Sequence, residues 1–542
     1  MSKKSWLIVC CCIFTAFVLS LALPAPAWSA QKVLKVNMDA DPRTIDPSRT
    51  TEVAAALVIM NCFEGLMGFD ADGKLVPVAA ESYEVSTDGL IYTFKLRKDG
   101  KWSNGDTVTA KDFVYSWKRV LEPGVATEYA SEMYIVKNGK SYNEGTAEDS
   151  ELGIKALDDY TLQITLENPT GYFLSFTAMF FAMPENEKVV SANEQWTLKG
   201  DTYVGNGPFR MVEWRPKESI VLERNPLHRA AADVKLDRVE FRILTDPNSA
   251  LATYEAGDLD VLDGNIPPAM IPNLIAEGQA ITVPYLATVR MQFNVSDNAM
   301  AFDAKQAKAT LDPKVRWALA LAIDRNVIVK NITRANERPA TSFVPRGIIG
   351  PDGHDFEFKD YYNPGGDVAE AKKLLAEAGY PDGKDFPELT YIYGDFGVNG
   401  EIAQAVQAMW KTNLNVTLNL ESMEYGVLLD RRSSQNRQYI IAFARWIADY
   451  VDPANFLEVF TYENSRNYNS QRYEELVAKA KTITDQAERF NVMRQAEDVL
   501  MGDMPVIPLY EMTNTLMIRD YVKGYDKDIM GYLQFSRVDI VK

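Results

Sequence analysis

The sequence predicts an α/β protein of several lobes, and three observations point to this class. The chain has 542 residues, more than one hydrophobic core usually organises, so about three lobes are expected. Its content of 46% hydrophobic and 11% aromatic residues is typical of a globular protein. Between residues 312 and 420, helical apolar patterns alternate with short strand-like runs, which indicates an α/β arrangement.

Residues 1–30 have the features of a targeting segment. Lys3 and Lys4 are followed by an uncharged, mostly apolar run, Trp6–Leu23, and then by small residues. Cleavage after Ser29 is expected, with the Ala25–Ala27 triplet as a competing site. The alternative is an uncleaved membrane anchor, because the apolar run is nearly long enough to span a bilayer.

The cysteines argue against a lipid anchor and against a disulfide. Cys10, Cys11 and Cys12 lie inside the apolar run, too early for lipid attachment at its exit. Cys62 is the remaining cysteine of the sequence, so the processed chain cannot form an internal disulfide. Its apolar surroundings predict a buried, inert thiol.

The acidic charge limits the classes of partner. The formal net charge is −18, and removal of residues 1–30, whose charges are Lys3 and Lys4, gives −18 − 2 = −20. This balance argues against nucleic acid and against anionic membranes as partners.

Local signals place elements in the first half of the chain. A helix is expected over Val53–Phe63, and another runs from Thr109 to about Leu121, begun by a capping-box variant with Asp112. The second helix presents Phe113, Trp117 and Val120 on one face, which is core spacing. Strands are expected at 33–38, 92–96, 155–166 (a strand–turn–strand pair), 220–225 and 237–244.

The second half combines long helices with short apolar strands. Helices are expected at 314–333, 368–378, 402–413 and 471–500, and the second of them ends at Gly379 as a C-cap. Strands are expected at 416–420, 439–444 and 504–510.

The stretch Ala444–Phe456 carries the main candidate for binding chemistry. A buried strand, Tyr439–Ala444, is followed by Trp446 and, three residues later, by the carboxylate of Asp449. An acidic group beside an indole just past a buried strand suits the capture of a cation such as an amine. The alternative is that Trp446 is a core residue and Asp449 caps the turn at Asn455–Phe456.

This stretch resembles the peptide-binding segment of the oligopeptide-binding proteins, the extracytoplasmic receptors of peptide ABC importers. The similarity extends from about Val33 to Val538 in the order of that family's motifs. The matching motifs are Asp41-Pro42 with Ile45-Asp46-Pro47, Glu64-Gly65-Leu66, the span Phe94–Leu121, Gly205–Phe209, and Arg445–Tyr450 with Pro453 and Asn455–Leu457.

The resemblance implies a two-lobed periplasmic binding protein fold of the class II-like cluster C type. An extra subdomain is then inserted in the first lobe, and the lobes close on a hinge. The implied division is signal peptide 1–30, lobe I at 31–63, 204–287 and 505–542, inserted subdomain II at 64–203, and lobe III at 288–504.

The resemblance also implies roles for individual residues. Asp449 is expected to bind the α-ammonium group of a peptide, and the segment around Trp446 to lie along the peptide backbone. Tyr129 is expected to reach that backbone through its hydroxyl, although a surface tyrosine on a loop is an equal alternative. The candidate ligand-binding residues are Thr51, Glu52, Val53, Tyr129, Arg445, Trp446, Ile447, Asp449 and Tyr510.

The chain departs from the family pattern near this site. Arg445 stands where relatives often have glycine, and Ile447 where some have a cysteine. Phe443 stands where some relatives have an arginine that assists the peptide carboxylate. Arg431, Arg432 and Arg445 could take over that duty or could be solvated, so the preferred peptide length is left open.

The expected function is capture of short peptides by hinge closure and their delivery to the permease subunits of an ABC transporter. The protein would be periplasmic and monomeric, without a cofactor or a metal. The first alternative is a receptor of the same fold for another solute, such as a dipeptide, a metal chelate or haem. The second, a secreted hydrolase, is disfavoured because His228 and His354 are the only histidines and no HExxH or GxSxG motif occurs.

Overall fold

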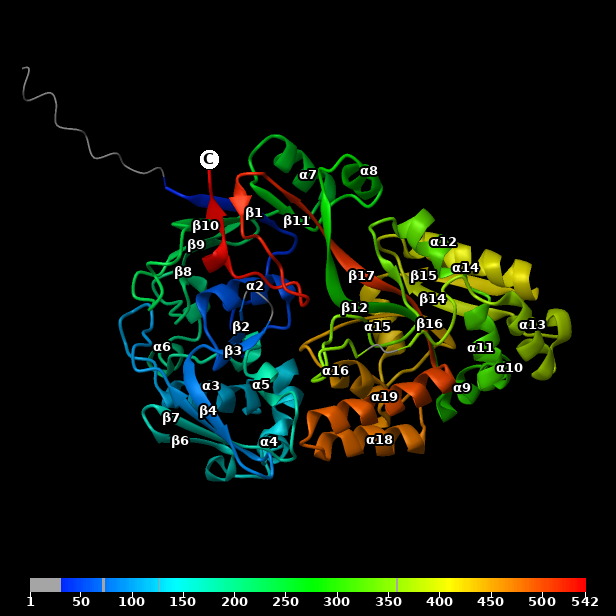
Figure 1. Ribbon diagram of the computed structural model, residues 1–542, viewed down its shortest axis with the longest axis horizontal. Helices are drawn as coiled ribbons and strands as arrows, with labels where there is room; N and C mark the ends of the chain where they lie inside the picture. Colours follow the sequence, from blue (N-terminus) through cyan, green and yellow to red (C-terminus); the bar gives the residue numbers. More distant parts are fainter. Residues whose placement is uncertain (1–30, 71–73, 126, 357–358) are drawn as a thin grey trace, which may run out of the picture.

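The computed structural model describes residues 31–70, 74–125, 127–356 and 359–542. The predicted targeting segment lies outside these residues. Two bodies are visible in Figure 1, joined by two long strands. The N-terminal body comprises the described residues of 33–276 together with 522–540, and the C-terminal body those of 297–503. No helix of the described chain is long and apolar enough to cross a membrane.

One mixed sheet runs through both bodies. Its strand order is β15-β14-β16-β12-β17-β11-β1-β10-β9-β8, and a short strand, β13, also pairs with β17. The bounds are β1 Val33–Met38, β8 Phe209–Arg215, β9 Ser219–Arg224, β10 Arg238–Ile243, β11 Val261–Asp263, β12 Ile281–Phe293, β13 Arg338–Pro339, β14 Leu389–Gly394, β15 Leu418–Met423, β16 Ile441–Ile447 and β17 Val506–Ile518.

The strands β12 and β17 connect the two bodies. They pair with each other in antiparallel fashion, from Ile281 opposite Leu516 to Gln292 opposite Val506. The end of β17 pairs with β11 of the N-terminal body, whereas the end of β12 pairs with β16 of the C-terminal body. The register shifts between Pro284 and Thr288, where proline cannot donate a ladder hydrogen bond. The regular ladder is therefore interrupted between the bodies.

A second, antiparallel sheet lies in the N-terminal body. Its order is β4 (Ala80–Val85), β5 (Ile91–Leu96), β7 (Thr161–Thr165), β6 (Ile154–Asp158). The helix α3 (Ala110–Leu121) packs on it, and its predicted core residues Phe113, Trp117 and Val120 are fully buried. The predicted capping box is also present, since the Thr109 amide donates to Asp112 at 2.7 Å.

Two predictions of single long helices are wrong. The helix expected at 314–333 ends as α11 (Pro313–Leu321), because Asp324 caps a new start at α12 (Arg325–Val327). The helix expected at 471–500 is two helices, α18 (Gln471–Thr482) and α19 (Gln486–Asp503). In each case an internal aspartate accepts backbone N–H groups, and this local bond favours a new helix start over continuation.

The remaining elements are short or lie on the outside of the sheets. They include the strand pairs β2 (Met67–Phe69) with β3 (Leu75–Pro77) and β18 (Val522–Lys523) with β19 (Asp539–Ile540). The helices among them include α2 Val53–Cys62, α4 Gly139–Asn143, α5 Phe173–Phe176, α6 Glu187–Val190, α7 Pro247–Glu255, α8 Ile271–Ala276, α9 Asp297–Phe302, α10 Ala304–Thr310, α13 Val368–Glu377, α14 Asn399–Leu414, α15 Tyr425–Arg432, α16 Pro453–Leu457, α17 Tyr462–Ser465, the 3-10 helices η1 Glu128–Ile135 and η7 Glu458–Phe460, and the π-helix η5 Ile328–Thr333. Cys62 at the end of α2 is buried, as predicted, and burial raises the pKa of its thiol.

Candidate ligand-binding site

The candidate stretch lies at the end of strand β16, in the region between the two bodies. This strand runs to Ile447, three residues beyond the predicted one, and Asp449 follows its end. The side chain of Asn455 joins the two candidates: its Oδ1 accepts from Trp446 Nε1 at 2.8 Å and from the Asp449 amide at 3.1 Å. Its Nδ2 donates to Asp449 Oδ2 at 3.3 Å. Asn455 thereby sets the distance between the indole and the carboxylate.

The alternative in which Asp449 caps the following turn is wrong. Asp452 caps α16 instead, accepting from the Ala454 amide at 2.9 Å. Asp452 is itself buried and held by Arg489, whose Nη1 lies 2.9 Å from Asp452 Oδ2. The carboxylate of Asp449 therefore does not cap this turn.

Asp449 is a half-buried carboxylate without a cationic partner. Its side-chain partners among the described residues are Asn455 and the hydroxyl of Tyr129, which donates to Oδ1 at 3.3 Å. Burial raises the pKa of Asp449 above its ordinary value, because no described lysine or arginine lies within ion-pair distance to compensate for desolvation. An ammonium group entering here would meet a carboxylate that has no positively charged partner among the described residues.

Tyr129 reaches Asp449 from the other body. It belongs to η1, and its ring stacks on Phe181 at 4.6 Å between centroids with an interplanar angle of 15°. A second aromatic contact joins the bodies, since Tyr172 stacks on Tyr450 at 4.4 Å. Tyr129 is thus packed between the two bodies rather than displayed as a surface residue on a loop.

A cavity of about 300 Å³ adjoins this carboxylate. Trp446 and Asp449 line it together with Glu132 of the N-terminal body. The other lining residues are Arg290, Gln292, Arg432, Ser434, Tyr450, Asn455, Glu458, Val459, Asn464 and Ser465. Carboxylates and arginines thus line the same cavity, so it is suited to a ligand that carries both signs of charge.

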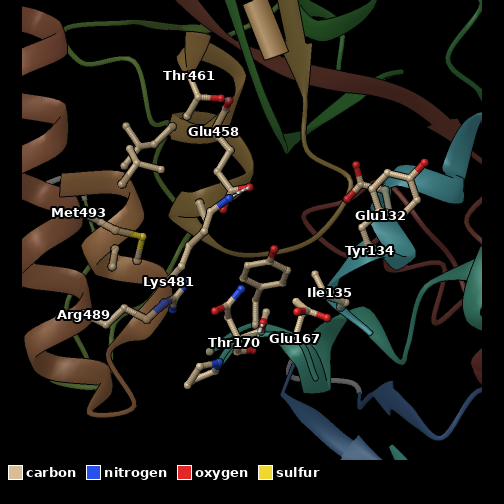
Figure 2. Close-up of a pocket in the computed structure, with 18 of the residues that line it drawn as sticks. Glu132, Tyr134, Ile135, Glu167, Thr170, Glu458, Thr461, Lys481, Arg489 and Met493 are labelled. Atoms are coloured by element: carbon tan, nitrogen blue, oxygen red, sulfur yellow. Dashed lines mark hydrogen bonds and ion pairs between the residues drawn. The ribbon is translucent and has the colours of Figure 1, made fainter. Parts of the chain in front are cut away.

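A neighbouring cavity of about 450 Å³ shares Glu132, Glu458 and Asn464 with the first. Figure 2 shows Glu458 and Lys481 on one wall of this cavity and Glu132 on the opposite wall. Lys481 pairs with Glu458 at 3.1 Å. Burial, with the nearby charges of Asp449 and Glu458, raises the pKa of Glu132 to about 7. The region between the bodies is therefore rich in carboxylates.

The other candidates lie in several different environments. Arg445 is half-buried, with its guanidinium carbon 5.5 Å from the Phe396 ring centroid and 5.7 Å from that of Tyr425. Ile447 pairs with Ala287 of β12. Tyr510 is buried on β17, and burial raises its pKa.

The segment at the start of α2 does not line either of these cavities. Thr51 and Glu52 are half-buried, Val53 is 59% exposed, and the carboxylate of Glu52 accepts from the Arg43 amide at 2.9 Å. No contact described for these three residues joins them to Asp449.

Arg432 and Arg431, two candidates for binding a peptide carboxylate, differ in their position relative to the smaller cavity. Arg432 lines the smaller cavity and donates from Nη1 to the Phe443 carbonyl at 2.7 Å. Arg431 lies outside that cavity and bonds to Glu421 at 3.1 Å.

Several residues of the site were not predicted. Glu132 and Glu458 carry no sequence signal, because only the folded chain brings them together. Arg290 does carry one: it is a charged residue inside the apolar strand β12, where a buried position is expected to be uncharged. Asn455 lies in the stretch that was singled out, but its bridging role depends on the turn at α16.

The comparisons with known proteins settle the family. The model of the bacterial extracellular solute-binding proteins, family 5 Middle, matches residues 74–468, more than half of the chain. The chain belongs to this family. The oligopeptide-binding protein OppA of Bacillus subtilis is a family 5 relative with 34% identity, covering 96% of this chain and 97% of its own.

Solved structures agree with the family 5 assignment. The Escherichia coli murein tripeptide binding protein MppA aligns with a TM-score of 0.76 and 31% identity, over 95% of this chain and 99% of that one. Haemophilus influenzae OppA, solved in complex with the peptide RPPGFSPFR, aligns with a TM-score of 0.74 and 31% identity, over 95% and 100% of the two chains. The predicted α/β fold of the two-lobed periplasmic binding protein type is confirmed.

Proposed function

We propose that this chain is an extracytoplasmic receptor that captures short peptides between its two bodies and delivers them to the permease of an ABC importer. The observation that carries the proposal is the carboxylate of Asp449, which is half-buried beside Trp446 in a cavity and has no cationic partner among the described residues. Family membership supports it, because family 5 relatives are named as peptide-binding proteins. The chain acts as a receptor and not as an enzyme.

The peptide's amino terminus binds at Asp449 in this proposal. A charge-assisted hydrogen bond of this kind contributes about 1.5–3 kcal/mol. Tyr129 reaches the same carboxylate from the opposite body, so it can contact the first residue of the peptide. The backbone of the peptide would then pair with exposed strand and loop edges, which gives binding that depends little on side-chain identity.

Closure requires a hinge, and β12 and β17 are the candidates for it. The irregular register between Pro284 and Thr288 lies between the parts that pair with the two bodies. Rotation there changes few backbone hydrogen bonds, and the closed form is what the permease would recognise. The lobe division given above, the cleaved signal peptide, the absence of a lipid anchor and the monomeric state belong to this proposal.

Isothermal titration calorimetry with tri-alanine tests the function. The protein should bind tri-alanine and should bind N-acetyl-tri-alanine at least tenfold more weakly, because acetylation removes the positive charge. When the protein is purified without denaturation, mass spectrometry of the molecules bound to it should detect peptides of a few residues. A single non-peptide solute in that experiment, with no binding of any free tripeptide, would show that the receptor serves another class of ligand.

A further inference from the structure

A turn at residues 528–532 lies beside the connection between the two bodies. Asp528 closes it: its carbonyl accepts from the Gly531 amide at 2.9 Å, and its carboxylate accepts from the Tyr532 amide at 2.8 Å. The Asp528 amide in turn donates to the Tyr532 carbonyl at 2.9 Å. These bonds within one short stretch make the 528–532 turn a compact unit.

The segment that carries this turn is fixed to the N-terminal body on both sides. Before the turn, Lys527 Nζ lies 2.8 Å from Asp263 Oδ1, and the two side chains are only 11% and 12% exposed. After the turn, the fully buried Asn61 donates from Nδ2 to the Leu533 carbonyl at 2.9 Å. Its Oδ1 accepts from the Phe535 amide at 2.8 Å. The 528–532 turn is therefore held in place on the N-terminal body.

The strand β12 bulges where it passes from one body to the other. Pro284 lies opposite Thr513 of β17, and Thr288 lies opposite Glu511. Over this stretch β12 therefore has two more residues than β17, which is the geometry of a bulge. Leu286 lies within the stretch and has no partner in the ladder between β12 and β17. Other contacts must therefore hold the bulge.

The 528–532 turn provides those contacts. Leu286, which is fully buried, donates its amide to the Ile529 carbonyl at 2.8 Å. Its own carbonyl accepts from the Ala448 amide of the C-terminal body at 2.9 Å. Gly531, with φ +78°, packs its backbone on a ring of the bulge, since a Cβ atom there would lie 2.9 Å from Tyr285 Cε2. The turn thus binds β12 at the position proposed for the hinge.

The same turn contacts the C-terminal body directly. Gly347 belongs to that body and has φ +109°. A Cβ atom at Gly347 would overlap Cδ1 of Ile529, so the isoleucine side chain fills the space that a side chain at Gly347 would need. Ile529 is half-buried by this packing. It is therefore a contact between the two bodies, next to the bulge.

We propose that the 528–532 turn is a stop that sets how far the two bodies close and stabilises the closed position. Rotation at the bulge moves Gly347 relative to Ile529, because the turn stays fixed to the N-terminal body. Further closure would drive the two residues into each other, and opening would separate them and forfeit their packing. The inference rests on the proposed function, in which closure captures the ligand.

Substitutions on the two sides of this contact test the stop. Ile529→Ala removes the contact but keeps the carbonyl that binds Leu286. Gly347→Ala adds a methyl group where Ile529 lies, so it should prevent full closure. The double variant, with both substitutions, has room for that methyl group again. Ile349→Ala is the matched control, because Ile349 is 60% exposed and lies two residues from Gly347.

The distance between the bodies can be measured by pulsed electron paramagnetic resonance. Spin labels on Lys155→Cys and Lys372→Cys, two exposed positions with one in each body, report it with and without tri-alanine. Calorimetry and stopped-flow dissociation give the affinity and the release rate of tri-alanine. Circular dichroism confirms that each variant is folded.

We expect Ile529→Ala to widen the distance distribution and to release tri-alanine about three- to tenfold faster. Gly347→Ala should lengthen the distance in the tri-alanine complex and weaken binding about tenfold or more. The double variant should recover most of that loss, because the backbone strain at Gly347 is the same in both variants and the overlap is relieved. Ile349→Ala should match the unchanged chain.

Unchanged distances and release rates in Ile529→Ala would overturn the inference, even if Gly347→Ala does not fold. So would a Gly347→Ala defect that persists in full in the double variant, because strain at φ +109° and not the contact would then explain it. If no protein binds a tripeptide, the peptide-binding proposal fails. The distances of the unliganded proteins still decide this inference, which predicts a wider distribution in Ile529→Ala than in the unchanged chain.

Discussion

Replacing Asp449 by Asn is the perturbation that bears most directly on peptide capture. The amide has nearly the same size as the carboxylate, and its oxygen can still accept from Tyr129, whose hydroxyl lies 3.3 Å from Oδ1. The long hydrogen bond from Asn455 Nδ2 to Oδ2, at 3.3 Å, is lost, because an NH2 group replaces that oxygen. The change therefore removes one negative charge and leaves the shape of the cavity nearly unaltered. In the peptide complex it leaves the ligand's ammonium group without a counter-charge.

The expected loss of affinity follows from that unpaired charge. Breaking one side of a desolvated charge pair costs about 2–5 kcal/mol, which corresponds to a factor of about 30 to 5,000 in Kd. The unliganded protein should not lose comparable stability, because burial already raises the pKa of Asp449 and no described cation depends on it. Asp449→Asn should thus weaken peptide binding strongly and change the free energy of unfolding of the unliganded protein much less.

Calorimetry with tri-alanine at pH 7, paired with thermal unfolding of the unliganded proteins, measures both quantities. Thr109→Ala serves as a control, since Thr109 caps α3 and lines neither cavity, so it should bind tri-alanine unchanged. A loss of less than threefold in the affinity of Asp449→Asn would refute the assignment of the ammonium group to this carboxylate. So would a loss that occurs equally for N-acetyl-tri-alanine.

Three further predictions concern stability. The pKa of Glu132 is raised from 4.5 to about 7, so its contribution to the free energy of unfolding is full below pH 4.5 and is lost as the pH rises through 7. Glu132→Gln should flatten that pH dependence by up to about 3 kcal/mol in urea titrations, and an unchanged slope would contradict the burial argument. Asp452→Ala leaves Arg489 buried without its carboxylate and should cost about 3–5 kcal/mol in the same assay, where a cost below 1 kcal/mol would contradict it. Thr109→Ala should cost about 0.5–2 kcal/mol through loss of the capping box, and an unchanged unfolding midpoint would exclude that role.

Much of the fold could be predicted because its signals are local. The strand at β1 and the helix α3 are specified by alternation, capping residues and the spacing of Phe113, Trp117 and Val120. The helix breaks at Asp324 and Asp485 were missed, because a capping aspartate inside a helical pattern looks like any polar surface residue until its bonds are known.

The residues of the site that lie in one stretch of sequence could be predicted. Those that come from elements distant in the sequence could not. Trp446 and Asp449 lie three positions apart, so the strand end brings them together. Glu132 and Arg290 join them only through the packing of η1 and β12, which no local pattern reports. Arg290 was nevertheless detectable in principle, as a charge within an apolar strand.

A crystal structure of the protein with a bound tripeptide tests the central claim most directly. The account predicts the α-ammonium nitrogen about 2.7–2.9 Å from a carboxylate oxygen of Asp449. The indole of Trp446 should lie alongside the first residues of the peptide. A peptide bound in the opposite direction, or an Asp449 side chain turned away from the ligand, would contradict the account.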